Sequence, residues 1–281
     1  MELKDLETGA TNTWCPGCGN FGILQAFKEA LVELGLSREQ VVIVSGIGCH
    51  GKICNYVNVN SFHVIHGRVL PVLTGIKLSN PELVAVGFAG DGDAYSIGLG
   101  HLPHTIRRNI DLTYIVHNNM VFGLTTGQTT PTSPLGFKTR STPFGSPEEP
   151  INPLTFALAL GATFVARGFP GRLPHLKSLI KQAILHKGFA LIDVLQPCVA
   201  FNNTWRFYNE RVYELEKEGH DPSDWDAAYK KALEWGEKIP IGLFYREEKP
   251  TLRDRLPQLS GEPLVRRPLE IKITKFLEEF R

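Results

Sequence analysis

The chain contains 281 residues, of which 42% are hydrophobic, 10% aromatic and 21% charged. This apolar fraction is sufficient to bury a large core, which excludes a disordered or fibrous protein. Thirty Lys and Arg residues oppose 29 Asp and Glu residues, giving a formal net charge of +1. A near-neutral chain has no electrostatic basis for binding nucleic acid, so that class of function is excluded as well.

Neither the start of the chain nor its apolar runs indicate a secreted or membrane protein. The residues from Met1 to Glu7 lack the apolar segment of a signal peptide. No stretch approaches the roughly 18–20 uninterrupted apolar residues of a membrane span. We therefore expect a cytoplasmic protein, in which five cysteines serve as metal ligands or redox groups more often than as disulfides.

Apolar runs alternate with helical patterns through the first 200 residues. Runs rich in β-branched residues, with little polar alternation, indicate strands covered on both faces; they are 41–44, 83–88, 112–116 and 190–195. Helical stretches lie between them and include 20–35, 68–79, 98–109, 152–160 and 174–187. This alternation predicts an α/β fold with a mostly parallel sheet and helices on both faces.

Charge is unevenly distributed and suggests how the chain is organised. From Phe207 to Arg281, 30 of 75 residues are charged, whereas the first 206 residues contain only 29 charges. We predict an α/β domain over 1–204 and a charged helical, proline-punctuated C-terminal extension over 205–281. Helices are expected within the extension at about 205–218 and 222–237. The stretch 125–150 is rich in Gly, Pro, Ser and Thr and is longer than a loop that merely joins two elements, so we expect it to be functional.

The sequence Cys15-Pro16-Gly17-Cys18-Gly19 places two thiols three residues apart. A thioredoxin-like dithiol would follow a strand, and none precedes this motif. A structural zinc site usually has two such knuckles, and only one is present. A [4Fe–4S] cluster accepts scattered thiolates, and Cys49 and Cys198 each follow a predicted strand, so both reach the same sheet edge. The spacing favours this cluster without excluding the other two sites, and Cys54 is interpreted as a buried, inert thiol.

The sequence Gly46-Ile47-Gly48-Cys49-His50-Gly51 follows a strand and has the GxGxxG spacing of a dinucleotide site. That fingerprint requires an acidic residue about 20 positions later, and the first acid after the motif is Glu82. We therefore interpret the motif as a glycine-lined turn that allows a diphosphate to approach the backbone.

The strongest motif combines the ends of two predicted strands. Gly90-Asp91-Gly92-Asp93 ends one strand and Asn118-Asn119 ends another. Parallel strands present their ligands at a common carboxyl edge, so these residues are expected to converge. The carboxylate of Asp91 and the amide oxygen of Asn119 are ligands of the kind that Mg²⁺ takes together with diphosphate oxygens. Two acidic turns that merely cap helices are the alternative.

Several motifs in a consistent order resemble one family. GDG followed by NN at this interval resembles the thiamine-diphosphate signature, and with CPGCG the chain resembles the β subunit of 2-oxoacid:ferredoxin oxidoreductases, over roughly residues 12–200. Further matching segments are Ser45–Cys49, His66–Arg68, Thr74–Lys77, Asn118–Thr125 and Gly127–Thr132. The resemblance implies a thiamine-diphosphate-binding fold. Taken as a whole, the sequence resembles 2-oxoglutarate enzymes more than pyruvate enzymes.

The resemblance also implies three groups of site residues. One [4Fe–4S] cluster would be held by Cys15, Cys18, Cys49 and Cys198. Mg²⁺ would be held by Asp91, Asn119 and the carbonyl of Val121. Thiamine diphosphate would be lined by Ile47, Gly48, Cys49, His50, His66, Gly92, Asp93, Gly123 and Leu124. Among the nearby histidines, His66 is the one expected to have a catalytic role.

By the same resemblance, the reaction is the CoA-dependent oxidative decarboxylation of a 2-oxoacid, with electrons passing through the cluster to ferredoxin. An α subunit (or a fused α/γ subunit) would supply the activating glutamate and most of the substrate pocket, in an αβ dimer or (αβ)₂. This chain alone should therefore be inactive. Many relatives carry lysine where this chain has Thr126, which leaves substrate class and CoA contact open. Substitute cations could be Lys52, Arg68, Lys138 and Arg140.

The sequence is compatible with three alternative functions. The first is the oxidoreductase subunit, acting on 2-oxoglutarate or alternatively on pyruvate or a branched-chain 2-oxoacid. The second is a non-oxidative thiamine-dependent decarboxylase, which would have no use for four cysteines. The third is a non-catalytic metal-binding module, which would have no use for Asp91 and Asn119.

Overall fold

The computed structural model describes residues 1–268 and 273–279. Its strands build one eight-stranded sheet in the order β2-β1-β3-β4-β8-β7-β10-β9, and a separate two-stranded ribbon of β5 and β6. The strands are β1 (Val41–Ser45), β2 (Asn60–His63), β3 (Val84–Gly90), β4 (Leu112–Asn118), β5 (Val121–Phe122), β6 (Gln128–Thr129), β7 (Phe164–Gly168), β8 (Phe189–Leu195), β9 (Val212–Glu214) and β10 (Ile239–Arg246).

Neighbouring strands of the large sheet are parallel except at one junction, where β10 runs antiparallel to β7. The α-helices are α1 (Asn20–Glu33), α2 (Val69–Ser79), α3 (Leu102–Arg107), α4 (Pro153–Ala159), α5 (Leu173–Leu185), α6 (Trp205–Arg211), α7 (Trp225–Leu233) and α8 (Thr274–Glu278). Among the shorter turns, those that follow site strands are η3 (His50–Asn55), η4 (Asp93–Ile97) and η5 (Leu99–His101).

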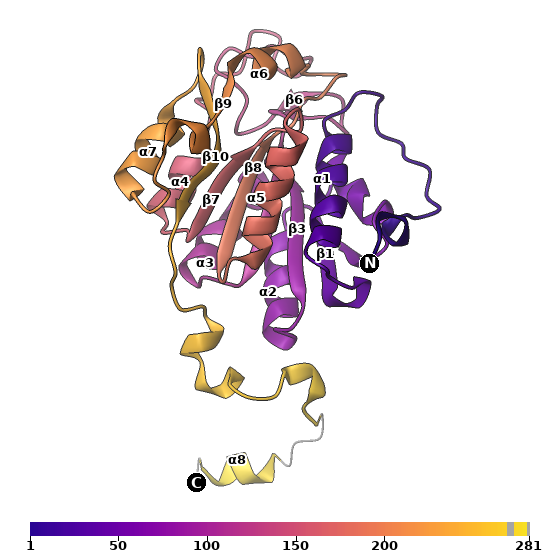
Figure 1. Cartoon of the computed structure of the whole chain (residues 1–281), viewed down its shortest axis with the longest axis vertical. Coiled ribbons are helices and arrows are strands. Elements are labelled where there is room, and N and C mark those ends of the chain that lie inside the picture. The colour runs from indigo at the N-terminus through magenta and orange to yellow at the C-terminus, as the bar shows by residue number, and fades with distance from the viewer. Residues whose placement is uncertain (269–272, 280–281) are drawn as a thin grey trace.

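The helices cover both faces of the sheet, which confirms the predicted fold class (Figure 1). On one face, α1 and α5 pack on the strands through Ile23, Phe27 and Leu179. On the other face, α2, α3, α4 and α7 form a second apolar layer. Strand β4 serves both layers, because Tyr114 and Val116 point to one and Ile115 to the other. Burial on both sides explains why these strands lack polar alternation.

Several predicted elements differ from those observed. The expected helix 98–109 begins only at Leu102, because a π-helical turn and a 3₁₀ turn precede it. The expected helix 205–218 ends at Arg211, since Val212–Glu214 forms β9 beside β10. Strands β2, β7 and β10 were not predicted.

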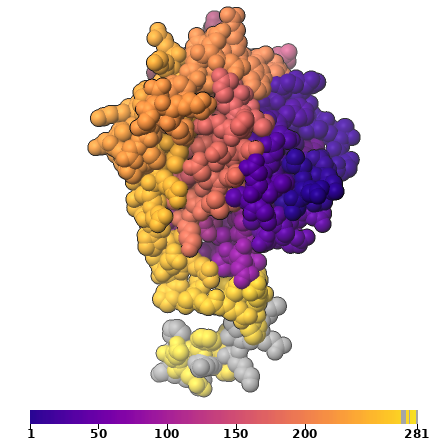
Figure 2. Space-filling view, in the orientation of Figure 1, coloured from indigo at the N-terminus to yellow at the C-terminus, as the bar shows by residue number. Residues whose placement is uncertain are grey.

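The C-terminal extension contributes to the sheet as well as to the surface. Strand β10 is buried over most of its length and lies between β7 and β9, so the extension is not wholly helical. After β10 the chain runs down one side of the body and continues below it (Figure 2). The side chain of Arg266 forms an ion pair with Glu82, which attaches this part of the extension to the domain.

Candidate functional site

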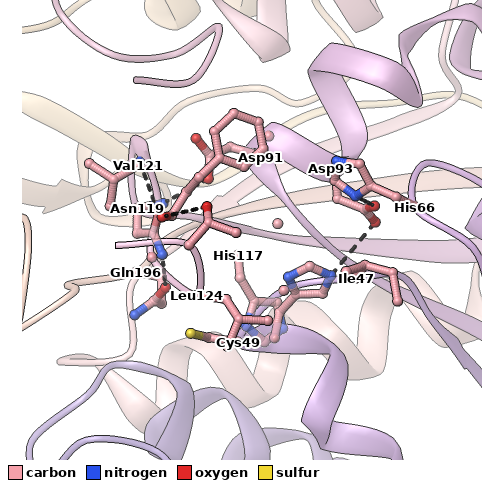
Figure 3. A pocket seen from close by; sticks show the side chains of 17 residues that line it. Ile47, Cys49, His66, Asp91, Asp93, His117, Asn119, Val121, Leu124 and Gln196 are labelled. Carbon is pink, nitrogen blue, oxygen red and sulfur yellow. Dashed lines mark hydrogen bonds and ion pairs between the residues drawn. The ribbon is translucent and has the colours of Figure 1, made fainter. Parts of the chain in front are cut away.

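A cavity of about 240 Å³ lies at the carboxyl ends of β1, β3 and β4 (Figure 3). All twelve residues predicted to contact thiamine diphosphate or Mg²⁺ line it: Ile47, Gly48, Cys49, His50, His66, Asp91, Gly92, Asp93, Asn119, Val121, Gly123 and Leu124. They come from the ends of β1, β3 and β4 and the turns that follow them, with His66 from the segment between β2 and α2. Parallel topology therefore brings together residues that are up to 77 positions apart in the sequence.

Two of the three predicted metal ligands, Asp91 and Asn119, are held by side-chain hydrogen bonds within the chain. Asp91 Oδ2 accepts from the hydroxyls of Thr130 at 2.5 Å and Thr132 at 2.7 Å. Asn119 Oδ1 accepts from the backbone N–H of Val121 at 3.0 Å. The Asn119 amide nitrogen donates to Gln196 Oε1 at 2.8 Å, which fixes the orientation of the Asn119 side chain. The backbone N–H of Asn119 also lies 3.4 Å from Asp91 Oδ1, so the two ligands are adjacent.

The electrostatic state of Asp91 fits a cation site. Its side chain is only 1% exposed, and burial raises its pKa from the ordinary range to about 6, despite the two threonine hydroxyls that lower it. No lysine or arginine of the described chain forms an ion pair with it. A buried carboxylate without a cationic partner is unfavourable unless a bound cation compensates its charge. The hard oxygen donors and this uncompensated charge fit Mg²⁺.

Glycines that border the cavity allow two side chains to pack directly against the backbone. A Cβ atom on Gly92 would overlap the Phe122 ring, and one on Gly90 would lie 2.8 Å from His50 Nδ1. Gly48 adopts φ +148, which side-chain-bearing residues rarely adopt, and a Cβ there would also meet His50. A larger residue at any of these positions would therefore displace a ring that lines the cavity.

Asp93 organises the two histidines of the cavity. His66 Nδ1 lies 2.6 Å from Asp93 Oδ1 and His50 Nε2 lies 3.6 Å from Oδ2 (Figure 3). The backbone N–H of Gly67 donates to the same carboxylate at 2.7 Å. Burial alone would raise the pKa of Asp93, but the two imidazoles and this N–H together lower it, so it is an anion that orients both rings.

The four predicted cluster ligands Cys15, Cys18, Cys49 and Cys198 line a second cavity of about 180 Å³. Cys54 lies outside it, with its thiol 2.9 Å from Ser45 Oγ. A Cβ atom on Gly123 would lie 3.6 Å from Cys198 Sγ and 3.8 Å from Cys49 Sγ, so glycine lets this loop approach both sulfurs. The two cavities share a wall of five residues: Cys49, Asn119, Gly123, Leu124 and Gln196.

The thiols are close enough to affect one another's ionisation. Burial, together with the charges of Cys198, Cys49 and Cys15, raises the pKa of Cys18 to about 11. Burial also raises the pKa of Cys49, although Lys52 lowers it. Within the described ranges, no three His, Cys, Asp or Glu side chains converge as ligands of a single metal ion. In a [4Fe–4S] cluster the thiolates bind separate irons, and a spread set of four sulfurs is what such a cluster accepts.

Some residues of the site were not predicted. His117, Phe122, Gln196, Gly90 and Thr125 also line the first cavity. His117 is 1% exposed, its Nδ1 lies 2.8 Å from Asn20 Oδ1, and burial holds its pKa well below the usual range. Polar residues at the carboxyl ends of two inner strands were the available signal, since His117 is the last residue but one of β4 and Gln196 directly follows β8.

The cations considered as substitutes for a lysine at position 126 are in different places. Thr126 itself is exposed and has φ +77, a strained conformation for a β-branched residue. Lys52 lines the cysteine cavity and its ammonium donates to Thr13 Oγ1 at 3.0 Å. Arg68 lies beside His66, with its guanidinium 3.4 Å from the His66 carbonyl. Lys138 and Arg140 are on the exposed loop and line neither cavity.

Comparison with known proteins identifies the family. Residues 46–194 match the family model described as thiamine pyrophosphate enzyme, C-terminal TPP binding domain. Residues 198–261 match the model for the C-terminal part of the pyruvate ferredoxin oxidoreductase beta subunit. The chain is 49% identical to the 2-oxoacid:ferredoxin oxidoreductase subunit beta of Saccharolobus solfataricus, over 84% of this chain and 82% of that protein. The chain belongs to the 2-oxoacid:ferredoxin oxidoreductase β subunits.

Two further relatives show how far this similarity extends. The 2-oxoglutarate synthase subunit KorB of Archaeoglobus fulgidus is 45% identical over 88% of this β subunit and 89% of its own length. The structure of 2-oxoglutarate:ferredoxin oxidoreductase from Magnetococcus marinus, with 2-oxoglutarate, coenzyme A and succinyl-CoA bound, superposes with a TM-score of 0.92 at 39% identity. It covers 100% of this chain and 96% of the matched chain. In the described part of the β subunit no helix has the length and apolarity that crossing a membrane requires.

Proposed function

We propose that this β subunit, together with an α subunit, catalyses the CoA-dependent oxidative decarboxylation of 2-oxoglutarate and transfers the electrons to ferredoxin. The shared wall between the two cavities supports this most directly. Cys49 lies on both cavities, and Gly123 brings the loop between them close to two sulfurs. A non-oxidative decarboxylase has no need of such proximity, because it transfers no electrons.

Each proposed cofactor has a set of residues to hold it. Asp91, Asn119 and the Val121 carbonyl would hold Mg²⁺ against the diphosphate, and Gly48, Gly90 and Gly92 would let the diphosphate approach the backbone. The four cavity cysteines would hold a [4Fe–4S] cluster. When bound, thiamine diphosphate supplies the electron sink that allows a 2-oxoacid to lose CO₂, and the cluster supplies one-electron transfer.

The histidines are positioned to manage protons near the reacting groups. With Nδ1 of His66 directed at the Asp93 anion, Nε2 is the nitrogen free to accept or donate a proton. The His66 side chain is 32% exposed, so it remains accessible from the cavity. His50 is buried behind Asp93 and acts on it from the other side. We propose His66 as the catalytic residue of this chain and His50 as part of the lining.

A partner subunit is needed to complete the site. The acidic side chains of the described residues that line the cavity are Asp91 and Asp93; no glutamate is among them. Large apolar side chains stand exposed around the entrance, including Ile47 at 43% and Leu124 at 48%. An α subunit that covers this rim would exclude water and contribute the activating glutamate. We propose an αβ dimer or (αβ)₂, located in the cytoplasm.

The preference for 2-oxoglutarate is supported by relatives named for it. The KorB proteins of Archaeoglobus fulgidus and Mycobacterium tuberculosis carry 2-oxoglutarate in their names, and the Magnetococcus marinus structure contains 2-oxoglutarate and coenzyme A. The Saccharolobus solfataricus relative is named only for 2-oxoacids. Pyruvate and branched-chain 2-oxoacids are therefore the alternative substrates, and Thr126 leaves CoA to be held by other groups.

The deciding experiment is anaerobic co-purification with the α subunit. We expect about four irons, four sulfides and one thiamine diphosphate per β chain. Ferredoxin reduction should require 2-oxoglutarate and CoA together, with a higher kcat/KM than for pyruvate or 2-oxoisovalerate. Thiamine diphosphate without iron would indicate the non-oxidative decarboxylase, and iron without thiamine diphosphate would indicate a binding module. Turnover by the β chain alone would contradict the requirement for the partner.

A further inference from the structure

A third cavity, of about 380 Å³, lies on the far side of the loop that follows β4. It shares none of its lining residues with the thiamine cavity. Its walls include Asn118, Met120 and Leu135 from this loop region, Arg167 of β7, Asp193 of β8 and Trp235. Its volume is in the range of small-molecule pockets, about 300–1,000 Å³. The proposed reaction does not use this cavity.

The polar centre of this cavity is a buried arginine that forms no ion pair with the described residues, although the Asp193 carboxylate lies on the neighbouring strand. Arg167 is 2% exposed and lies between the rings of Trp235 and Phe244, at 5.3 and 5.4 Å from their centroids. Its Nη1 donates a long hydrogen bond of 3.4 Å to the Pro240 carbonyl. Its Nε has no hydrogen-bond partner among the described residues. A guanidinium removed from water and left partly unsatisfied is unfavourable, so a ligand that accepts its hydrogen bonds would be stabilised.

The neighbouring carboxylate does not fill this role. Asp193 is the register partner of Arg167 on β8, but no ion pair forms between them. Its oxygens accept instead from the Tyr95 hydroxyl at 2.9 Å and from the Asn118 amide at 3.2 Å. The guanidinium Nε is thus left without an acceptor, and a planar carboxylate matches the geometry of a guanidinium group.

Charge and shape narrow the class of ligand. The lining contains one cation, Arg167, and two acids, Asp193 and Glu149, so a phosphate or other polyanion would be repelled. The remaining walls are largely apolar, with Met120, Leu135 and the Trp235 ring among them. An apolar pocket with a few placed polar groups selects a ligand with an apolar body and one polar end.

We propose that this cavity is a second ligand site of the β subunit, in which Arg167 binds the carboxylate of a small aliphatic monocarboxylic acid and Met120, Leu135 and Trp235 enclose its apolar body. The site is separate from the substrate site and involves no chemical step. Two residues that line it, Asn118 and Thr132, also support the proposed metal site. The Thr132 hydroxyl hydrogen-bonds to Asp91, a proposed metal ligand, and to Asn118, the neighbour of Asn119. An occupant therefore lies one residue away from a proposed metal ligand.

The test is calorimetric titration of the αβ complex, loaded with Mg²⁺ and thiamine diphosphate, with three probes. Isobutyrate has the proposed chemistry and lacks the 2-oxo group of a substrate. Isobutyramide has the same shape without the charge, and inorganic phosphate is the polyanion. We expect saturable isobutyrate binding, with the amide and phosphate each at least about tenfold weaker.

Two variants locate the binding. Arg167→Met should weaken isobutyrate binding at least about tenfold, whereas Arg172→Met, at an arginine outside the cavity, should leave it unchanged. Leu135→Trp places a bulky ring at a mouth residue that is 55% exposed and should also abolish binding while leaving Arg167 intact. If Arg167→Met does not fold, Leu135→Trp decides. Absence of binding to the unaltered complex, or binding that survives in either cavity variant, would overturn the proposal.

Discussion

The thiamine cavity and the cysteine cavity lie side by side but are held together in different ways. In the thiamine cavity, Asp91 is buried at a strand end and accepts three hydrogen bonds from its own chain. In the cysteine cavity the four thiols come from three separate segments, and Cys15 is exposed. The Cys18 sulfur accepts a 3.4 Å hydrogen bond from the Gln196 amide. Hydrogen bonds within the chain therefore orient the side chain of Asp91, whereas Cys18 is the one thiol of the four with a side-chain hydrogen bond among the described residues.

The largest effect is expected when one thiol of the cysteine cavity is removed, which should affect that cavity and not the thiamine cavity. Cys198 lines the cysteine cavity but not the thiamine cavity, so Cys198→Ser should reduce iron from about four to below one atom per chain. Ferredoxin reduction should be lost, while the dissociation constant for thiamine diphosphate changes by less than about threefold. Iron analysis and calorimetry measure the two quantities. Cys54→Ser is the matched control and should retain full iron; a Cys198→Ser enzyme with full iron would refute the proposed ligand set.

A substitution of Asp91 tests the proposed Mg²⁺ site of the thiamine cavity. Asp91→Asn keeps the shape of the side chain and removes its charge, so Mg²⁺-dependent binding of thiamine diphosphate should weaken by at least about 100-fold. The iron content should stay at about four, because the cysteine cavity does not include Asp91. Asp226→Asn, on the exposed surface of α7, should leave both quantities unchanged. Loss of iron in Asp91→Asn would show that the two cavities do not form independently.

A weaker effect is expected when a group that supports the ligand is changed. Thr132→Val removes the hydroxyl that donates to Asp91 at 2.7 Å and preserves the volume of the side chain. We expect the Mg²⁺ dissociation constant to increase about tenfold, with kcat at saturating cofactor within about twofold. Thr139→Val, on the loop away from both cavities, is the control. A fall in kcat without a change in metal affinity would instead place Thr132 in the reaction.

A last expected effect, no larger than that of Thr132→Val, is a pH dependence confined to the thiamine cavity. Burial raises the pKa of metal-free Asp91 to about 6, so its protonated form is favoured by folding. The stability that this adds to the metal-free protein is complete below about pH 4 and is lost as the pH rises through about 6. Mg²⁺ needs the ionised form, so its affinity should be about tenfold lower at pH 5 than at pH 7.

Asp91→Asn provides the reference for that measurement, because the diphosphate also titrates in this range. The part of the pH dependence that disappears in Asp91→Asn belongs to Asp91. Calorimetric dissociation constants at several pH values give both curves. Identical slopes in the two proteins would contradict a raised pKa at Asp91.

The convergence of the predicted site residues on one cavity followed from the sequence because most of them lie at strand ends. Asp91 and Asn119 follow β3 and β4, which are apolar runs recognisable without knowledge of the fold. Since parallel strands end at a common edge, predicting the strands also placed their ligands together. Thr130 and Thr132 were missed because they lie in a loop whose conformation is fixed by tertiary contacts, and no local periodicity predicts which hydroxyl faces Asp91.

The elements that escaped prediction carry unusual residues for their position. Strand β7 contains Arg167, a charged residue in an otherwise apolar strand. Strand β10 contains Pro240 and Gly242, two residues that are typical of a loop in a proline-rich tail. β10 follows α7 but pairs antiparallel with β7, so it departs from the parallel strands that the alternating pattern predicts. The sequence of Val212–Glu214 fits an amphipathic helix, and these residues form a strand because they pair with β10. Long-range pairing outweighed local preference at each of these places.

The indoles of two tryptophans form hydrogen bonds to backbone carbonyls beside the cysteine cavity. The indole N–H of Trp14 donates to the Cys49 carbonyl at 2.6 Å, and that of Trp205 donates to the Gly17 carbonyl at 2.8 Å. Iron–sulfur clusters absorb light at the wavelengths where indoles emit. A cluster in the neighbouring cavity would therefore quench the fluorescence of both rings, and the recovery of emission during exposure to air would time its loss in a single cuvette, without chemical labelling.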